Sequence, residues 1–250
     1  MKRLIGIIGF TVIVLSPIWG QTADELLERG NNFFTNGDYD QAILEYTRVI
    51  RLLPGNYTGY YNRGLAYYNK GDYDRAIADM NEVIGINPGL SEAYVNRGFA
   101  HFYKDDYERA ITDFSFAIRL NLRDAYVFVY RGLSYDALSE YDLAIADFTQ
   151  AIRLNRNDAD MYYYRGNSYF QKGDYNRAIS DYTRTIRMAP QADNAYTHRG
   201  YAYFMRNDYN RAIADANAAL RINPEHPYAR ELLESAQTEQ EQARQSGRRR

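Results

Sequence analysis

The sequence predicts an all-α solenoid of six helix-turn-helix units followed by a C-terminal capping helix. Three observations predict it: a glycine recurs every 34 residues, an alanine recurs with the same step, and turn residues lie between them. The recurring residues are Gly30, Gly64, Gly98, Gly132, Gly166 and Gly200, and Ala42, Ala76, Ala110, Ala144, Ala178 and Ala212. Self-similarity with a fixed period of this length is typical of stacked repeats.

The repeat divides the chain into units that follow one another without insertion or deletion. The units are 23–56, 57–90, 91–124, 125–158, 159–192 and 193–226. Each has a first helix with the glycine and a second helix with the alanine. In the second unit, Gly71 can adopt the left-handed conformation that ends a helix, and Asp72 can cap the next helix. Asn87 and Pro88 then end the second helix, because proline cannot continue it.

The recurring glycine lies inside the first helix, where it costs about 1 kcal/mol relative to alanine. We expect it to let the two helices of a unit pack backbone to backbone, with the alanine at the contact. Two aromatic positions fill the space around this contact. They are Phe33, Tyr67, His101, Tyr135, Tyr169 and Tyr203, and Tyr39, Tyr73, Tyr107, Tyr141, Tyr175 and Tyr209. One hairpin cannot bury these faces alone, so neighbouring units must stack.

These residues resemble the tetratricopeptide repeat (TPR) family. Its pattern of glycine, tyrosine, alanine, aromatic residue, alanine and proline at fixed steps of a 34-residue unit is present over residues 23–226. The resemblance implies a right-handed superhelical solenoid. Leu122 and Arg156 depart from the pattern at the proline position, and Ala216 replaces a larger residue in the sixth unit.

Residues 227–250 are expected to form a capping helix and a polar tail. A helix from Pro227 to about Ala236 would place Tyr228, Leu232 and Leu233 on one face, which would cover the open end of the last unit. Residues 237–250 are rich in Gln, Glu and Arg, so we expect this part to fray.

The first twenty residues predict export. Lys2 and Arg3 form a basic head, and the run from Leu4 to Trp19 has no charge. This run is shorter than the roughly 20 residues that span a bilayer. Residues 1–20 therefore predict a signal peptide, cleaved after Gly20 or Ala23; the alternative is an uncleaved anchor. The expected location is periplasmic or secreted, with membrane contact only if the segment stays uncleaved.

Composition argues against several functions. The formal net charge of −2 does not favour nucleic acid as a partner, and the absence of cysteine excludes thiolate metal sites and a cysteine nucleophile. His101, His198 and His226 do not have metal-site spacing, and no phosphate-binding glycine loop occurs. We therefore expect no enzyme activity, cofactor or metal. His101 takes an aromatic position, so we interpret it as a core histidine.

An arginine precedes each recurring glycine, and a carboxylate follows sixteen residues later. The pairs are Arg29 and Glu45, Arg63 and Asp79, Arg97 and Asp113, Arg131 and Asp147, Arg165 and Asp181, and Arg199 and Asp215. Such arginines could capture an acidic ligand or bridge the two helices of a unit. The matching period of the acids favours the structural bridge.

The resemblance also implies that first-helix residues line a concave partner-binding groove. The residues are Tyr61, Asn62, Leu65, Asn96, Phe99, Tyr103, Val129, Tyr130, Leu133, Tyr163, Tyr164, Asn167, His198 and Tyr201. Tyrosine provides rigid contact area, and asparagine can pair with the backbone of an extended peptide. The predicted function is an extracytoplasmic scaffold with protein or peptide partners. The alternative is a binding protein for a small apolar ligand or peptide in the same groove.

The fourth unit differs from the others. Residues 125–130 are apolar where other units have polar residues, and Leu138 and Leu143 add further apolar side chains. Contiguous apolar surface often marks an interface. We therefore expect this unit to centre a partner contact or a homo-oligomer contact, which charged substitutions at Val127 and Val129 would test.

Overall fold

The computed structural model describes residues 22–248, and this part of the chain forms thirteen α-helices and no strand. The helices are α1 (Ala23–Thr35), α2 (Tyr39–Leu52), α3 (Tyr57–Asn69), α4 (Tyr73–Ile86), α5 (Ser91–Phe102), α6 (Tyr107–Arg119), α7 (Ala125–Ala137), α8 (Tyr141–Leu154), α9 (Ala159–Gln171), α10 (Tyr175–Met188), α11 (Asp193–Phe204), α12 (Tyr209–Ile222) and α13 (Pro227–Arg248). The predicted signal peptide and residues 249–250 lie outside this range. Among the described helices, none is both long enough and apolar enough to span a membrane.

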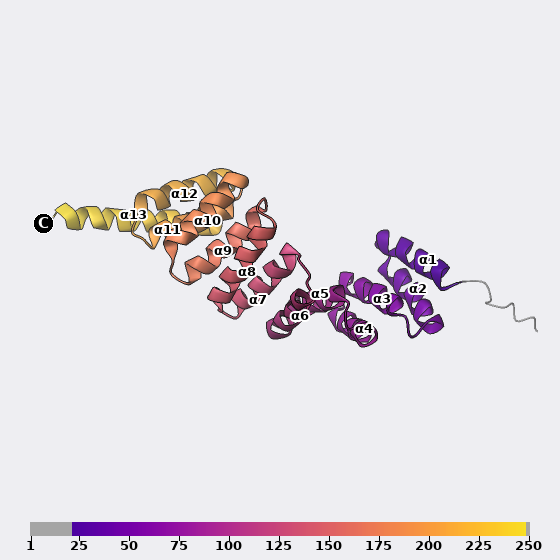
Figure 1. Cartoon of the computed structure of the whole chain (residues 1–250). Coiled ribbons are helices and arrows are strands. Elements are labelled where there is room, and N and C mark those ends of the chain that lie inside the picture. The colour runs from indigo at the N-terminus through magenta and orange to yellow at the C-terminus, as the bar shows by residue number, and fades with distance from the viewer. Residues whose placement is uncertain (1–21, 249–250) are drawn as a thin grey trace, which may run out of the picture.

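The first twelve helices pair into six hairpins, and the all-α class is confirmed. Hairpin 1 is α1 and α2, and hairpin 6 is α11 and α12. The hairpins stack into one elongated array with α1 and α13 at opposite ends (Figure 1). Each hairpin contacts only its neighbours in the chain, which is the behaviour of a solenoid.

The two rows of helices are spaced differently. Each first helix (α1, α3, α5, α7, α9, α11) contacts the next first helix, whereas over residues 22–248 the second helices do not contact one another. The row with closer spacing must lie on the concave side of a curved array. We call the first helices the inner row, the second helices the outer row, and the surface of the inner row the inner surface.

The turns inside the hairpins follow the predicted residue chemistry. Gly37, Gly71 and Gly173 have φ near +80°, and Asp105, Ser139 and Asn207 take the same position with φ of 58° to 63°. The aspartate after each of these residues caps the second helix; for example, Asp174 accepts a hydrogen bond from the Arg177 N–H at 3.1 Å. Hairpin 4 is the exception, because Glu140 makes no such bond.

The recurring glycine makes room for a side chain of the second helix. The sequence prediction that the two helix backbones pack against each other there is therefore wrong. A Cβ atom on Gly132 would lie 2.9 Å from the Phe148 ring, and one on Gly30 would lie 2.5 Å from the Tyr46 ring. A large second-helix side chain therefore covers the glycine in hairpins 1 to 5. Close backbone approach is only a secondary effect: a Cβ atom on Gly64 would lie 3.5 Å from the Ala76 carbonyl oxygen.

The last hairpin lacks this large side chain, and α13 supplies it. Ala216 takes the position of Phe148, and a Cβ atom on Gly200, the glycine of this hairpin, would instead lie 2.6 Å from Leu232 of α13. Leu232 is fully buried with Ala216 and Ala236. The predicted cap is thus present. Two details of the prediction are wrong: Tyr228 is 63 % exposed, and the helix continues past 236 to Arg248.

The predicted arginine–carboxylate bridges are present in every hairpin. In hairpin 4, Arg131 donates two hydrogen bonds of 2.7 Å from Nε and Nη2 to the Asp147 carboxylate. Its Nη1 atom donates at 3.0 Å to Ser115, which belongs to α6 of the preceding hairpin. The same third contact recurs at Thr47, Asn81, Thr149 and Thr183. We call each set of arginine, carboxylate and preceding-hairpin acceptor a clamp, because it joins two helices and two hairpins.

We predict that Asp147→Asn lowers the free energy of unfolding by about 3 kcal/mol. Asp147 is 4 % exposed, and its loss leaves the largely buried Arg131 charge without its partner. Chemical denaturation followed by circular dichroism measures the change. Asp142→Asn in the same helix is the control. Asp142 pairs with Lys172 at the surface, so its removal should cost less than about 1 kcal/mol. Equal effects of the two substitutions would contradict the clamp.

Leu232→Ala is expected to destabilise the chain by about 3 kcal/mol, because it opens a cavity over Gly200. Tyr228→Ala removes an exposed ring from the same helix and should change stability by less than about 0.5 kcal/mol. Thermal unfolding of both variants checks this prediction. An unchanged melting temperature in Leu232→Ala would show that α13 does not stabilise the array.

Candidate partner-binding groove

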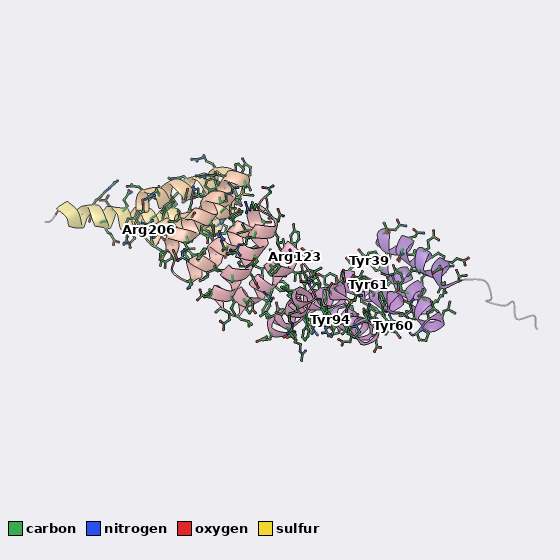
Figure 2. The ribbon with its side chains drawn as sticks, in the orientation of Figure 1. Tyr39, Tyr60, Tyr61, Tyr94, Arg123 and Arg206 are labelled. Atoms are coloured by element: carbon green, nitrogen blue, oxygen red, sulfur yellow. The ribbon has the colours of Figure 1, made fainter. Side chains whose placement is uncertain are left out.

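The inner surface is held together by side-chain contacts between successive first helices. Asn96 of α5 donates a hydrogen bond from Nδ2 to the Tyr61 hydroxyl of α3 at 3.0 Å. The hydroxyls of Tyr103 and Tyr130 lie 3.3 Å apart across α5 and α7. Four of the predicted groove residues therefore contact one another along the seams between hairpins 2, 3 and 4. Figure 2 shows Tyr61 on the inner helices among the side chains that cover the array.

An aromatic cluster extends over hairpins 2 to 4 on this surface. The Tyr130 ring meets Phe99 edge to face at 4.7 Å and Phe102 at 5.1 Å, and Tyr103 stacks on Tyr73 at 5.8 Å. The hydrogen bond between Tyr130 and Tyr103, together with burial, raises the pKa of Tyr130 to about 12. The cluster comprises Tyr68, Tyr73, Phe99, Phe102, Tyr103 and Tyr130.

Sequence reasoning missed Tyr68 and Phe102 as members of the inner surface. The available signal was a further aromatic position with the 34-residue step, at Phe34, Tyr68, Phe102, Phe170 and Phe204. Each of these rings packs against the tyrosine that starts the second helix of its hairpin.

A second inner cluster forms at hairpins 5 and 6. The Tyr163 hydroxyl lies 3.2 Å from Nδ1 of His198, which also contacts the Asn194 carbonyl at 2.8 Å. Burial lowers the pKa of His198, which favours the neutral ring. Asn167 accepts a hydrogen bond of 2.8 Å from the buried Tyr182 hydroxyl. The Asn167 side chain therefore supports the core, and it also hydrogen-bonds the Tyr163 hydroxyl.

In two hairpins, a buried tyrosine hydroxyl of the second helix donates a hydrogen bond to an asparagine of the first helix. Asn31 accepts from Tyr46 at 2.8 Å in hairpin 1, as Asn167 does from Tyr182 in hairpin 5. Where the second helix has an apolar residue, the first-helix position is apolar too, so that Leu133 packs in the cluster of Phe148. Leu65 packs likewise beside Met80.

The predicted apolar surface of hairpin 4 is partly wrong. Val127 is 1 % exposed and Val129 is 4 % exposed, and both belong to the core. Charged substitutions there would unfold the hairpin rather than test a surface. Residues two apart lie on different sides of a helix, so Val127 packs with Ala110 and Phe114 of hairpin 3, whereas Val129 packs with Phe148 of α8 and Met161 of α9. Leu138 and Leu143 are exposed, as expected.

A pocket of about 220 Å³ opens between α7 and α9 on the inner surface. Four predicted groove residues line it, namely Val129, Tyr130, Leu133 and Tyr164. Its remaining lining residues are Tyr126, Asp158, Asp160 and Met161, which sequence reasoning missed. The remaining predicted residues, Asn62 and Tyr201, are half-buried on α3 and α11, and the Tyr201 hydroxyl donates to the Tyr228 carbonyl at 3.1 Å.

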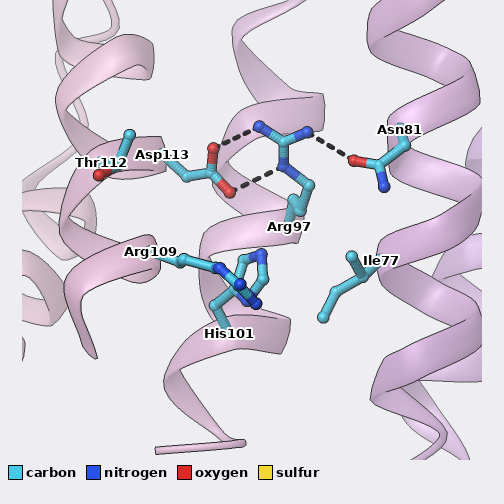
Figure 3. A pocket seen from close by; sticks show the side chains of 7 residues that line it. All are labelled: Ile77, Asn81, Arg97, His101, Arg109, Thr112 and Asp113. Carbon is cyan, nitrogen blue, oxygen red and sulfur yellow. Dashed lines mark hydrogen bonds and ion pairs between the residues drawn. The ribbon is translucent and has the colours of Figure 1, made fainter. Parts of the chain in front are cut away.

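A second pocket, of about 320 Å³, lies beside a clamp and contains His101 (Figure 3). Arg97 there binds Asp113 through two hydrogen bonds and Asn81 through a third. His101 is 7 % exposed, so the predicted core histidine is confirmed. Its Nδ1 atom has no hydrogen-bond partner and lies 3.6 Å from the Asp106 carboxylate. Burial lowers the pKa of His101.

Within residues 22–248, no three His, Asp or Glu side chains come together as a metal site. The groove instead presents tyrosine rings, amides and hydroxyl groups on rigid helices. Such groups form hydrogen bonds and aromatic contacts with a polypeptide.

Comparisons with known proteins agree with this fold. A tetratricopeptide repeat model matches residues 27–91 and 163–227, a TPR repeat model matches 132–173, and a further tetratricopeptide repeat model matches 91–124. A search of curated proteins gave no match.

Several solved structures are similar. PilF of Pseudomonas aeruginosa gives a TM-score of 0.70 at 16 % identity, over 85 % of this chain and 97 % of that chain. YrrB, a TPR protein with an unusual peptide-binding site, gives 0.68 at 22 % identity, over 74 % and 95 %. MamA gives 0.63 at 27 % identity, over 65 % and 95 %.

The stacked hairpins and their inner surface define a helical-repeat scaffold. The family models cover most of the hairpins, and the chain belongs to the tetratricopeptide repeat family. Proteins of this family are generally non-enzymatic scaffolds with protein or peptide partners.

We predict that stability falls as the pH drops below about 6.5, the ordinary pKa of histidine. Burial lowers the folded-state pKa of His101, so the unfolded chain binds more protons in this range. His101→Tyr restores the residue found at this position in most hairpins and should reduce the loss. Unfolding at about pH 7.5 and about pH 5 measures it. The remaining pH dependence should include His198, and an unchanged loss in the variant would contradict a role for His101.

Proposed function

We propose that the chain is a scaffold that binds a partner polypeptide along the inner surface of the solenoid. The observation that supports this most directly is the aromatic cluster of hairpins 2 to 4. Tyr103 is 47 % exposed within it, although its ring stacks on Tyr73 and its hydroxyl meets Tyr130. A rigid, partly exposed array of tyrosines provides contact area at low entropic cost.

The relatives support this proposal by analogy. YrrB is described as having a peptide-binding site on a similar fold. At 22 % identity the likeness concerns the fold alone, so the residues proposed for this chain rest on its own geometry.

We further propose that the scaffold acts outside the cytoplasm. The support is the sequence of residues 1–20, with its basic head and uncharged run, and the absence of cysteine. If this segment is retained, it would also tether the scaffold to a membrane.

A small apolar ligand is the alternative occupant. The inner pocket between α7 and α9, at about 220 Å³, is smaller than the roughly 300–1,000 Å³ usual for small-molecule sites. Its size suits one side chain of a bound polypeptide better than a separate ligand.

We predict that Tyr103→Ser lowers recovery of the partner about tenfold. An exposed tyrosine inside an aromatic cluster is typical of a binding hot spot. The measurement is quantitative affinity capture from the exported fraction of the native cell, with crosslinks mapped by mass spectrometry. Phe116→Ser is the matched control, because Phe116 is 42 % exposed but lies on α6, in the outer row.

Loss of the partner in Phe116→Ser but not in Tyr103→Ser would place the contact on the outer row and refute the proposal. Recovery of a small molecule with no protein would favour the alternative.

A further inference from the structure

Charge is divided between the two rows of helices. In α1, α3, α5, α7, α9 and α11, the clamp arginine is the only lysine or arginine, and a second-helix carboxylate binds it. The same helices carry carboxylates outside the clamps: Asp24, Glu25, Glu28, Glu92, Asp136, Asp160 and Asp193. The inner row therefore has a negative charge that no cation of its own offsets.

The outer row has the opposite balance. Exposed arginines outside the clamps occur there at Arg48, Arg51, Arg119, Arg153, Arg184 and Arg187. An elongated partner that lies along the inner row would meet carboxylates and tyrosine rings, whereas these arginines belong to the second helices. This separation favours a cationic segment over an acidic one in the groove.

The pocket between α7 and α9 combines three chemistries at one point of this surface. Tyr126, Tyr130 and Tyr164 provide aromatic rings, and Asp158 and Asp160 provide carboxylates. Apolar atoms come from Val129, Leu133 and Met161, of which Val129 and Met161 are almost fully buried. An arginine side chain requires the same set: apolar contact for its stem, aromatic faces for the guanidinium plane and carboxylates for its charge.

The carboxylates at this pocket are not neutralised by arginine or lysine. Asp158 caps α9 by accepting from the Asp160 N–H at 3.0 Å, and it also accepts from the Tyr126 hydroxyl at 3.3 Å. The Asp160 side chain is exposed, and its carboxylate accepts no hydrogen bond within residues 22–248. The N-terminus of α9 contributes only about half a positive charge, so two carboxylates leave the pocket negative.

The negative field acts on the pocket tyrosines. The Asp158 carboxylate is the largest cause of the raised pKa of Tyr126. Burial raises the pKa of Tyr164, and Asp160 and Asp158 add to the shift. The three rings thus remain neutral phenols, which is the form whose face attracts a cation.

The chain already uses this combination elsewhere. The Arg75 guanidinium lies 4.5 Å from the Tyr67 ring centre while it pairs with Asp72. Arg211 does the same with Tyr203, at 4.6 Å, and Asp208. At the α7–α9 pocket, the tyrosines and aspartates are present and the arginine is not.

We propose that this pocket binds an arginine side chain of the partner polypeptide. The inference rests on the proposed function, because it assumes that a polypeptide lies on the inner surface. It adds a chemical preference: the segment that crosses hairpins 4 and 5 carries an arginine, and the pocket discriminates against a neutral side chain of the same shape.

The test uses residues 21–250 labelled with ¹³C at the methionine methyl groups. Met161 lines the pocket, and the exposed Met205 on α11 is an internal reference. The probes are acetyl-Gly-Ser-Arg-Ser-Gly-amide and the same peptide with citrulline, which keeps the shape and loses the charge. We expect the arginine peptide to shift the Met161 methyl resonance saturably, with at least about fivefold tighter binding than the citrulline peptide.

Asp158→Asn with Asp160→Asn should reduce the affinity for the arginine peptide about fivefold, towards that of the citrulline peptide. Asparagine retains the helix cap, so this double variant should fold. The control is Asp24→Asn with Glu28→Gln on α1, which changes the net charge equally but lies far from the pocket. At physiological salt its effect should be small, because distant exposed charges are screened.

Equal binding of the two peptides, an unchanged affinity in the Asp158/Asp160 variant, or no Met161 shift at about 10 mM probe would overturn the arginine pocket. These outcomes leave the scaffold proposal to be judged separately, by the Tyr103→Ser capture experiment. Conversely, if the pocket selects arginine but Tyr103→Ser does not reduce recovery of the partner, the pocket proposal stands and the aromatic groove is refuted.

Discussion

The contact between the clamp arginine, its carboxylate and the preceding hairpin is the interaction on which the rest of the array depends. From hairpin 2 onwards, each guanidinium binds a carboxylate in its own hairpin through two parallel hydrogen bonds and reaches a hydroxyl or amide in the preceding hairpin. Aspartate in this position is nearly buried, as at Asp147, so the pair is shielded from solvent. A planar fork with fixed directions suits this task better than an ammonium group would. Each clamp thereby sets both the angle within a hairpin and the contact to its neighbour.

The clamp also determines the chemistry of the inner surface. Because every first-helix arginine binds a carboxylate at the helix interface, none remains to attract an acidic ligand. The groove is left with tyrosines, amides and the unpaired carboxylates. A structural requirement of the solenoid and the charge preference of its concave side thus have one origin. The surface lysines follow a related rule, since Lys70 and Lys172 pair with Asp40 and Asp142 of the preceding hairpins.

Hairpin 4 breaks the repeat in several places at once. Asp136 takes the position that is aromatic in the other five hairpins, and it accepts a hydrogen bond of 2.6 Å from Ser168 of α9. Tyr141 consequently lacks the ring partner of its equivalents, although its hydroxyl donates to Ser139 as those of Tyr107 and Tyr209 donate to Asp105 and Asn207. Burial raises the pKa of Asp136, which is a cost that the repeat pattern alone would avoid. Hairpin 4 thus has a half-buried carboxyl group where the other hairpins have a ring, next to the hairpin interface at which the α7–α9 pocket opens.

The sequence by itself determined the repeat, the turns and the clamps. Gly71 and Asp72 act through local backbone conformation, and Arg131 and Asp147 recur with a period that only a regular array can satisfy. Other features depended on tertiary contacts between residues far apart in the chain. Leu232 replaces the side chain missing at Ala216, Val129 is buried although the residues beside it are only half-buried, and Asp158 joins Tyr130 and Tyr164 at one pocket. A helical period defines which residues share a face, but the curvature and stacking of the hairpins decide what each face meets.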